Sequence, residues 1–103
     1  MQFDIYANKN KASKAEFPFL LDIQSNTLEK LATRIVVPLT PATKINKPTT
    51  ILQPLVTVNK KQYIALFDEM ASYPSSELLV RVGNLVDNRT LFLNALDLII
   101  QGY

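Results

Sequence analysis

The sequence contains no cysteine and no histidine. Without cysteine the chain has neither a disulfide framework nor a thiolate nucleophile. Without histidine it lacks the commonest general base and the commonest zinc ligand. These two absences exclude Ser-His-Asp and Cys-His catalytic arrangements and every histidine-containing metal site. We therefore expect no catalytic residue, no bound metal and no cofactor.

Glycine is also scarce, with only Gly83 and Gly102, whereas proline occurs six times in the 103 residues. A hydrophobic content of 48% predicts a single globular domain that spans the whole chain. The net charge of +2 is too small to argue for nucleic-acid binding. Lys9, Lys11 and Lys14 form a local basic stretch, which is interpreted as a solvated hairpin tip, with a landing site for an acidic partner as the alternative.

Long apolar runs are missing as well. No run reaches membrane-spanning length, and no charged segment followed by an apolar one resembles a leader. The expectation is a soluble cytoplasmic protein with no membrane partner.

Apolar and polar residues alternate with the period of a β-strand in several segments. The pattern predicts strands over residues 2–6, 17–23, 34–39, 52–58 and 62–67. The last two strands are expected to form a hairpin around residues 59–61. Proline cannot donate to a sheet ladder, which places Pro38 at a sheet edge or at a strand end. Residues 70–76 are predicted to be irregular around Pro74, and residues 41–50 to form a mobile surface loop.

One helix is predicted near the end of the chain. Asp87 or Asn88 is a suitable N-cap for a helix that runs to about Gln101. Its polar residues fall on one stripe, which comprises Thr90, Asn94, Asp97 and Gln101. The apolar arc is wider than one sheet face covers, so the helix is expected to pack against a second surface, such as another subunit.

Seven short segments, spread in order along almost the whole chain, carry a family resemblance. They are Met1-Gln2-Phe3 with Tyr6, Asp22-Ile23-Gln24-Ser25, Arg34-Ile35-Val36-Val37-Pro38-Leu39, Gln53-Pro54-Leu55-Val56, Met70-Ala71-Ser72-Tyr73-Pro74, Asn94-Ala95-Leu96-Asp97-Leu98 and Gly102. In this order and spacing they resemble the CcdB toxins of plasmid and chromosomal addiction modules.

The resemblance implies a fold and a function. The fold would be mainly β with one C-terminal helix, an SH3-like barrel made of a twisted antiparallel sheet, a small second sheet and the helix. The protein would be a homodimer and not an enzyme. It would bind the A subunit of DNA gyrase and trap gyrase on cleaved DNA. A CcdA-like antitoxin would neutralise it, and operator DNA would be bound only through the toxin–antitoxin complex.

The resemblance also implies site residues. The expected gyrase-binding residues are Gln101, Gly102 and Tyr103 at the end of the chain, Ile100 and Asp97 of the helix, and Thr27 and Leu28 after the second strand. The expected antitoxin-binding loop contains Pro41, Lys44, Lys47 and Pro48. The best-known members carry tryptophan before the terminal glycine and an aliphatic residue after it. Here Gln101 and Tyr103 replace them, which removes a typical aromatic anchor. The retained Gly102 fits a close backbone approach.

Two alternatives remain at this point. A MazF-like endoribonuclease would need a base and a cation. Arg34 or Arg81 could supply the cation and Asp22 or Glu77 the base, although no spacing selects such a pair. A structural ion pair between Arg34 and Asp22 on neighbouring strands is the simpler interpretation. The second alternative is a non-toxic relative that binds antitoxin but does not poison gyrase.

Overall fold

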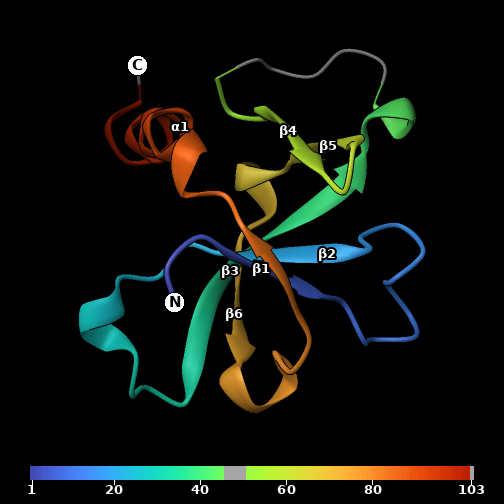
Figure 1. Ribbon diagram of the computed structural model, residues 1–103. Coiled ribbons are helices and arrows are strands. Elements are labelled where there is room, and N and C mark those ends of the chain that lie inside the picture. Colours follow the sequence, from blue (N-terminus) through green and yellow to red (C-terminus); the bar gives the residue numbers. More distant parts are fainter. Residues whose placement is uncertain (46–50, 103) are drawn as a thin grey trace.

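The computed structural model describes residues 1–45 and 51–102, which form one curled antiparallel sheet with a helix across it (Figure 1). The elements are β1 (Asp4–Ala7), β2 (Phe19–Asp22), β3 (Thr33–Pro41), β4 (Leu55–Val58), β5 (Lys61–Ala65), β6 (Ala71–Pro74), β7 (Arg81–Asn84) and α1 (Arg89–Gln101). The strand order is β4-β5-β3-β2-β1-β7, and β6 pairs with β3. The predicted fold, mainly β with one C-terminal helix, is confirmed. The expected small second sheet is not separate, because all the described strands belong to one sheet that curls round on itself.

Strand β3 joins the two ends of the sheet. One of its edges pairs with β2, and the other is shared by β6 at residues 33–36 and β5 at residues 39–41. Pro38 lies where β6 has ended and β5 has not begun. Its carbonyl accepts a hydrogen bond from the Leu66 N–H at 3.0 Å, and its missing N–H points to the same edge. Of the two predicted positions for Pro38, the strand end is wrong, because β3 continues to Pro41. The edge alternative fits locally, since the Pro38 nitrogen faces the junction between β6 and β5 and interrupts no ladder.

All five predicted strands exist, although their limits differ, and two strands, β6 and β7, were missed. β4 begins at Leu55 and not at residue 52, whereas β3 continues to Pro41. Residues 71–74, predicted to be irregular, form β6, because pairing with β3 fixes a segment whose own pattern is weak. The hairpin is confirmed. Its two turn residues, Asn59 and Lys60, have φ of 52° and 67°, as a type I′ turn requires.

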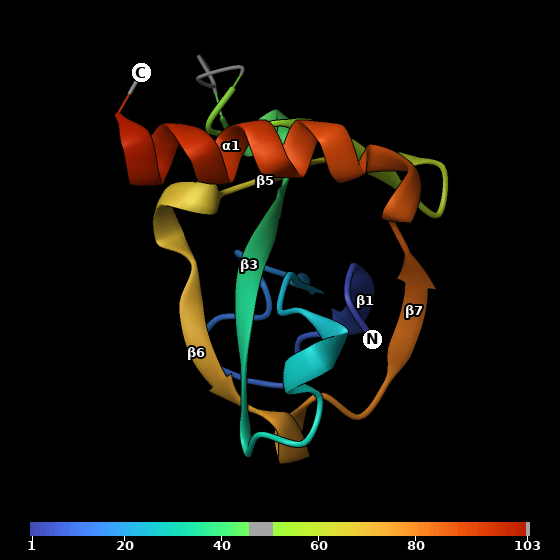
Figure 2. The same ribbon diagram turned by 90° about the vertical axis from the view of Figure 1, so that its left-hand side faces the viewer.

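The core lies between the curled sheet and α1. Phe92 of α1 is fully buried, and its ring centroid lies 5.5 Å from that of Phe3 and 5.6 Å from that of Phe67. Figure 2 shows α1 lying across one end of the sheet, above β3 and between β6 and β7. The helix contacts two short 3₁₀ turns, η3 (Phe67–Glu69), which connects β5 to β6, and η5 (Val86–Asn88), which connects β7 to α1.

The predicted helix limits are correct, with Asn88 as N-cap and Gln101 as last residue. The four residues of the polar stripe are all exposed. Apolar residues of the helix are also exposed, which is consistent with the expected second surface. They are Leu91 (44%), Leu93 (39%), Ile99 (39%) and Ile100 (77%). No helix of the described ranges is long and apolar enough to cross a membrane.

The predicted loop at residues 41–50 begins later than expected. Pro41 is the last residue of β3, and a 3₁₀ turn, η2 (Ala42–Lys44), follows it directly. The Lys44 ammonium is tied to the β1–β2 loop by a hydrogen bond of 3.0 Å to the Ala15 carbonyl. Lys47 and Pro48 lie outside the described residues.

Candidate functional site

The last turn of α1 carries three of the predicted gyrase-binding residues as exposed side chains. Asp97 and Gln101 are exposed, and Ile100 is 77% exposed, which is the largest value among the large apolar side chains that are described. Gly102 ends the helix with φ of 77°, and its N–H bonds to the Leu98 carbonyl at 2.9 Å. This backbone conformation is the physical requirement for glycine there.

No atom lies within 4 Å of where a Gly102 Cβ would be. Within the described residues nothing approaches the Gly102 backbone closely, and the expected approach of a partner there stays a prediction. The glycine serves as the left-handed C-cap of α1. Tyr103 lies outside the described residues.

Thr27 and Leu28 belong to a second element, the 3₁₀ turn η1 (Asn26–Leu28). The Ser25 hydroxyl caps this turn by accepting the Thr27 N–H at 3.2 Å, and Gln24 donates its side-chain amide to the Leu28 carbonyl at 3.1 Å. These bonds hold η1 in place while Thr27 and Leu28 stay exposed, Leu28 at 47%. η1 is therefore a defined platform and not a free loop.

α1 and η1 lie on the same face of the molecule. Both are on the left-hand side of Figure 1, and both face the viewer in Figure 2, with α1 above η1. We call this surface the α1–η1 face; it comprises Thr27, Leu28, Asp97, Ile100, Gln101 and Gly102. Its described members come from segments about 70 positions apart in the sequence, and the fold places them on one side.

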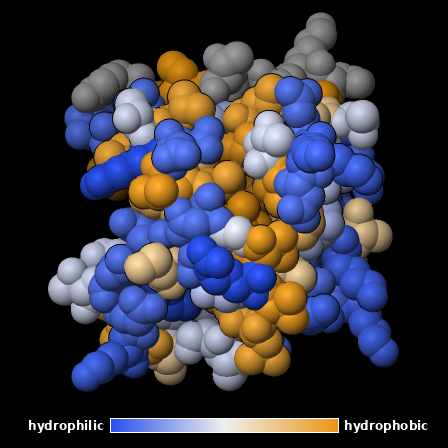
Figure 3. All heavy atoms as spheres, viewed as in Figure 1, coloured by the Kyte–Doolittle hydropathy of each residue, from blue (hydrophilic) through white to orange (hydrophobic). Residues whose placement is uncertain are grey.

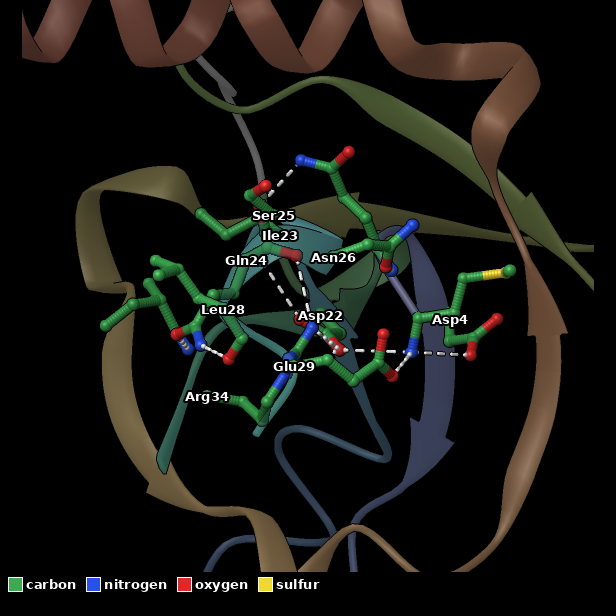
Figure 4. A network of polar contacts seen from close by, with 12 residues as sticks. Asp4, Asp22, Ile23, Gln24, Ser25, Asn26, Leu28, Glu29 and Arg34 are labelled. Atoms are coloured by element: carbon green, nitrogen blue, oxygen red, sulfur yellow. Dashed lines mark hydrogen bonds and ion pairs between the residues drawn. The ribbon is translucent and has the colours of Figure 1, made fainter. Parts of the chain in front are cut away.

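Behind η1 lies a buried polar network, shown in Figure 4. The Arg34 guanidinium binds Asp22 Oδ2 through Nε at 3.0 Å and Nη2 at 2.8 Å, and Nη2 also donates to the Gln24 carbonyl at 3.1 Å. Arg34 and Asp22 are only 4% and 1% exposed. The structural ion pair on neighbouring strands is thereby confirmed. The pair anchors the strand ends from which η1 projects.

The α-amino group of Met1 joins the same network. It lies 3.2 Å from carboxylate oxygens of both Asp4 and Glu29, and 3.7 Å from Asp22 Oδ2. Burial by itself would lower the pKa of this amine, but the hydrogen bonds to Asp4 and Glu29 outweigh burial and raise the pKa. Sequence patterns missed this cluster because nothing in the order of residues brings the amine to three carboxylates.

Asp4 is buried, and burial alone would raise its pKa. Hydrogen bonds from Asn84 (2.9 Å) and Arg81 (2.8 Å), followed by the Met1 amine, overcome burial and lower the pKa. The carboxylate therefore stays ionised and ties β1 to β7. Burial and the nearby Asp4 charge raise the pKa of the Tyr6 hydroxyl.

The two arginines considered for phosphate chemistry are thus both bound to buried carboxylates, Arg34 to Asp22 and Arg81 to Asp4. The cavity beside Arg34 has a volume of about 110 Å³, well below the several hundred Å³ of a typical ligand site. Arg34 Nη1 is buried there without a hydrogen-bond partner. Within the described ranges, no cluster of three or more acidic side chains is placed to hold a metal ion.

The family comparison covers the segments that form this face. The model of the family described as CcdB protein matches residues 2–102 of the 103-residue chain. The chain belongs to the CcdB family. Membership of the CcdB family supports its assignment as the toxin of a toxin–antitoxin system.

The matched segment of the CcdB family contains the α1–η1 face and, apart from Met1, the buried network. It begins after Met1 and ends at Gly102, so the Gly102 C-cap and the η1 platform both lie inside it. Pro41 ends β3, and Lys44 belongs to η2, which follows it. In Figure 1 this green end of β3 and η2 lie on the right-hand side, whereas α1 lies on the left. The described parts of the two expected surfaces of this CcdB-family chain are thus separate.

Proposed function

We propose that this protein is a toxin that binds the A subunit of DNA gyrase and traps the gyrase–DNA cleavage complex. The contact surface is the α1–η1 face together with Tyr103. A cognate CcdA-like antitoxin neutralises the toxin in the cytoplasm, through the loop that includes Pro41, Lys44, Lys47 and Pro48. The toxin and the antitoxin together repress their operon.

The observation that supports this surface is the exposure of apolar side chains next to polar ones. Ile100 is 77% and Leu28 is 47% exposed on the same face, beside Asp97, Gln101 and Thr27. Protein interfaces combine a few apolar anchors with a polar rim. The same face carries no pair of groups placed for acid–base chemistry, so inhibition by binding fits it better than catalysis does.

The proposal includes a homodimer. The exposed apolar side chains of α1, namely Leu91, Leu93 and Ile99, leave helix surface that a second copy would cover. Sedimentation at micromolar concentration should give about twice the chain mass of 11.6 kDa. A clean monomer would contradict the dimer without deciding the gyrase contact.

The test uses gyrase, ATP and supercoiled plasmid, with linear DNA measured after detergent and protease treatment. The protein should increase linear DNA. Ile100→Ser should weaken this effect at least 10-fold, since an interface anchor contributes roughly 2 kcal/mol or more. Leu79→Ser is the matched control, because Leu79 is equally exposed (75%) but lies in the loop before β7. It should poison gyrase like the unmodified protein.

Three results would change the assignment. An equal loss in the Ile100 and Leu79 variants would remove the α1–η1 face from the proposal. Antitoxin binding without gyrase-linked cleavage would favour the non-toxic relative. Cleavage of naked RNA by the purified protein would favour the endoribonuclease.

A further inference from the structure

Six lysines gather at the end of the sheet away from η1. They come from three segments: the β1–β2 loop at residues 8–18, η2, and the turn between β4 and β5 with the first residue of β5. We call this region the lysine end; its cations are Lys9, Lys11, Lys14, Lys44, Lys60 and Lys61. All six are exposed, and Glu16 is the one carboxylate in these segments. None of the six forms an ion pair with any described residue.

Two contacts show that the three segments are neighbours. The Lys44 hydrogen bond to the Ala15 carbonyl joins η2 to the β1–β2 loop. An open cleft of about 750 Å³ joins η2 to the β4–β5 hairpin, and its walls include Thr43, Lys60 and Lys61. The segments lie along the right-hand side of Figure 1, where hydrophilic residues gather in the space-filling view of Figure 3.

The β1–β2 loop is held by its own polar contacts. Asn8 is only 6% exposed, and its side-chain amide donates to the Ser13 hydroxyl at 3.0 Å and to the Phe17 carbonyl at 2.8 Å. Asn10 Oδ1 accepts the Ala12 N–H at 2.8 Å. This scaffold fixes the backbone from which Lys9, Lys11 and Lys14 project. A partner therefore meets a preorganised set of charges, which lowers the entropic cost of binding.

The net charge of +2 is the sum of a basic part and an acidic part of the molecule. The three segments of the lysine end carry six cations against one anion, and Glu77 lines a cavity together with Lys9 at their border. The rest of the chain is net acidic. Charges within about 10 Å of one another add their fields at moderate ionic strength. Local charge, and not the chain total, decides what this end attracts.

We propose that the lysine end binds the phosphate backbone of duplex DNA without reading its sequence. Lysine ammonium groups are point-charge ligands for phosphate, and the Thr43 and Thr57 hydroxyls at the cleft add hydrogen-bonding groups. Tyr63, the one aromatic residue of the cleft walls, is 9% exposed and offers no ring for stacking unpaired bases. Those features favour an intact duplex over a single strand.

Charge density separates DNA from an acidic protein segment. Duplex DNA carries one negative charge per about 1.7 Å of axis. An extended peptide advances about 3.3–3.6 Å per residue, so even an unbroken acidic run has half that density. Six lysines on three separate segments match the denser, two-sided polyanion better. If the antitoxin brings the toxin to its operator, as the proposed function has it, Lys44 is covered by the antitoxin and the other five lysines of this end add the contacts to DNA.

The test is anisotropy of a labelled short duplex with free toxin between about 50 and 200 mM salt. The triple variant Lys9→Gln, Lys11→Gln, Lys14→Gln should reduce the steepness of the negative slope of log K against log salt by about 2.7, since each phosphate contact contributes about 0.9. Lys60→Gln with Lys61→Gln should lower it by about 1.8. The matched control, Lys30→Gln with Arg89→Gln, removes the same two charges outside the lysine end and should leave the slope unchanged.

Each contrary result has a definite meaning. An equal loss in the control pair would show that total charge acts and would overturn the assignment of a site. Binding of polyglutamate through the same lysines, without binding of DNA, would replace DNA by an acidic protein. Gyrase poisoning is measured separately on the same variants. Loss of DNA binding with intact poisoning supports the lysine end and leaves the α1–η1 face untouched.

Discussion

The buried pair of Arg34 and Asp22 offers the sharpest test of what holds the η1 platform. Asp22→Asn keeps the shape and an acceptor for the Gln24 N–H (3.0 Å), but removes the charge that faces Arg34 at 2.8 Å. The guanidinium would then remain 4% exposed without its counter-charge. Removing one partner of a buried pair costs about 3–5 kcal/mol. The free energy of unfolding of a domain is roughly 5–15 kcal/mol in total, so this loss is a large part of it.

Arg34→Met should cost less than Asp22→Asn. Asp22 would still have the Met1 amine 3.7 Å from Oδ2 and the Gln24 N–H on Oδ1. The double variant should cost far less than the sum of the two single variants, because no unpaired charge is left inside. A coupling of several kcal/mol between the two positions is expected.

The measurement is urea and thermal unfolding of all four proteins at pH 7 and one fixed concentration, since dimerisation would make stability depend on concentration. Asp22→Asn should lower the melting temperature by roughly 12–40 °C, from about 4–8 °C per kcal/mol. A loss below about 1 kcal/mol, the value of an exposed pair, would refute the reasoning. It would mean that solvent reaches the guanidinium.

Three further predictions concern the turn, the N-terminal strand and the end of the helix. Lys60 has φ of 67°, which glycine adopts without strain. Lys60→Gly should therefore raise the free energy of unfolding in urea by about 0.5–1 kcal/mol. Lys60→Gln removes the charge but keeps the backbone strain, so it should not stabilise the protein. The lowered pKa of Asp4 means that its stabilisation is present above the unfolded pKa of about 3.9 and is lost as pH falls through the folded value. Unfolding free energy should therefore fall more steeply with acid in the unmodified protein than in Asp4→Asn, and parallel curves would contradict this. Removing Gly102 and Tyr103 should change the melting temperature little but abolish gyrase binding, and Gln101→Trp should strengthen binding by roughly 1–3 kcal/mol in a calorimetric titration. If the variant without Gly102 and Tyr103 lost most of its thermal stability but still bound gyrase, these residues would have a structural role instead of a binding role.

The local sequence pattern was sufficient to predict secondary structure wherever buried and exposed residues alternate regularly along the chain. β4 alternates buried Val56 and Val58 with exposed Leu55 and Thr57, and the helix repeats its polar stripe every three or four residues. Both periodicities reflect one buried side and one exposed side. The hairpin and the helix limits were therefore predictable from the sequence.

The sequence pattern failed to predict structure where pairing with a neighbouring strand determines the conformation of a segment. β6 is exposed or half-buried along its length, so its residues show no alternation, and its hydrogen bonds to β3 alone make it a strand. Pro38 misled for the same reason. Whether a missing N–H matters depends on which strand lies opposite, and that is a property of the sheet and not of the segment.

The candidate site was predictable as a set of residues but not as a surface. The resemblance supplied the positions in η1 and α1, whereas the Ser25 cap, the Gln24 bridge and the buried charges that support η1 involve contacts between separate segments. The Met1 amine is a still clearer case, because its three carboxylates come from β1, β2 and the segment after η1.

The exposed half of α1 connects the fold to the proposed assembly. One curled sheet of short strands offers the helix a single face to pack on, and Phe92 and Ala95 fill it. Leu96 and Leu98 of this 13-residue helix are half-buried, and the other apolar residues are left exposed by the described part of the chain. Leu91 and Leu93 near its start and Ile99 and Ile100 near its end stay 39–77% exposed. Apolar surface of this kind, carried on a helix that the core already holds rigid, costs no further folding entropy when another chain covers it. The small sheet buries only part of the helix, which limits the stability of the single chain. The apolar surface that it leaves exposed is therefore free to bind a partner.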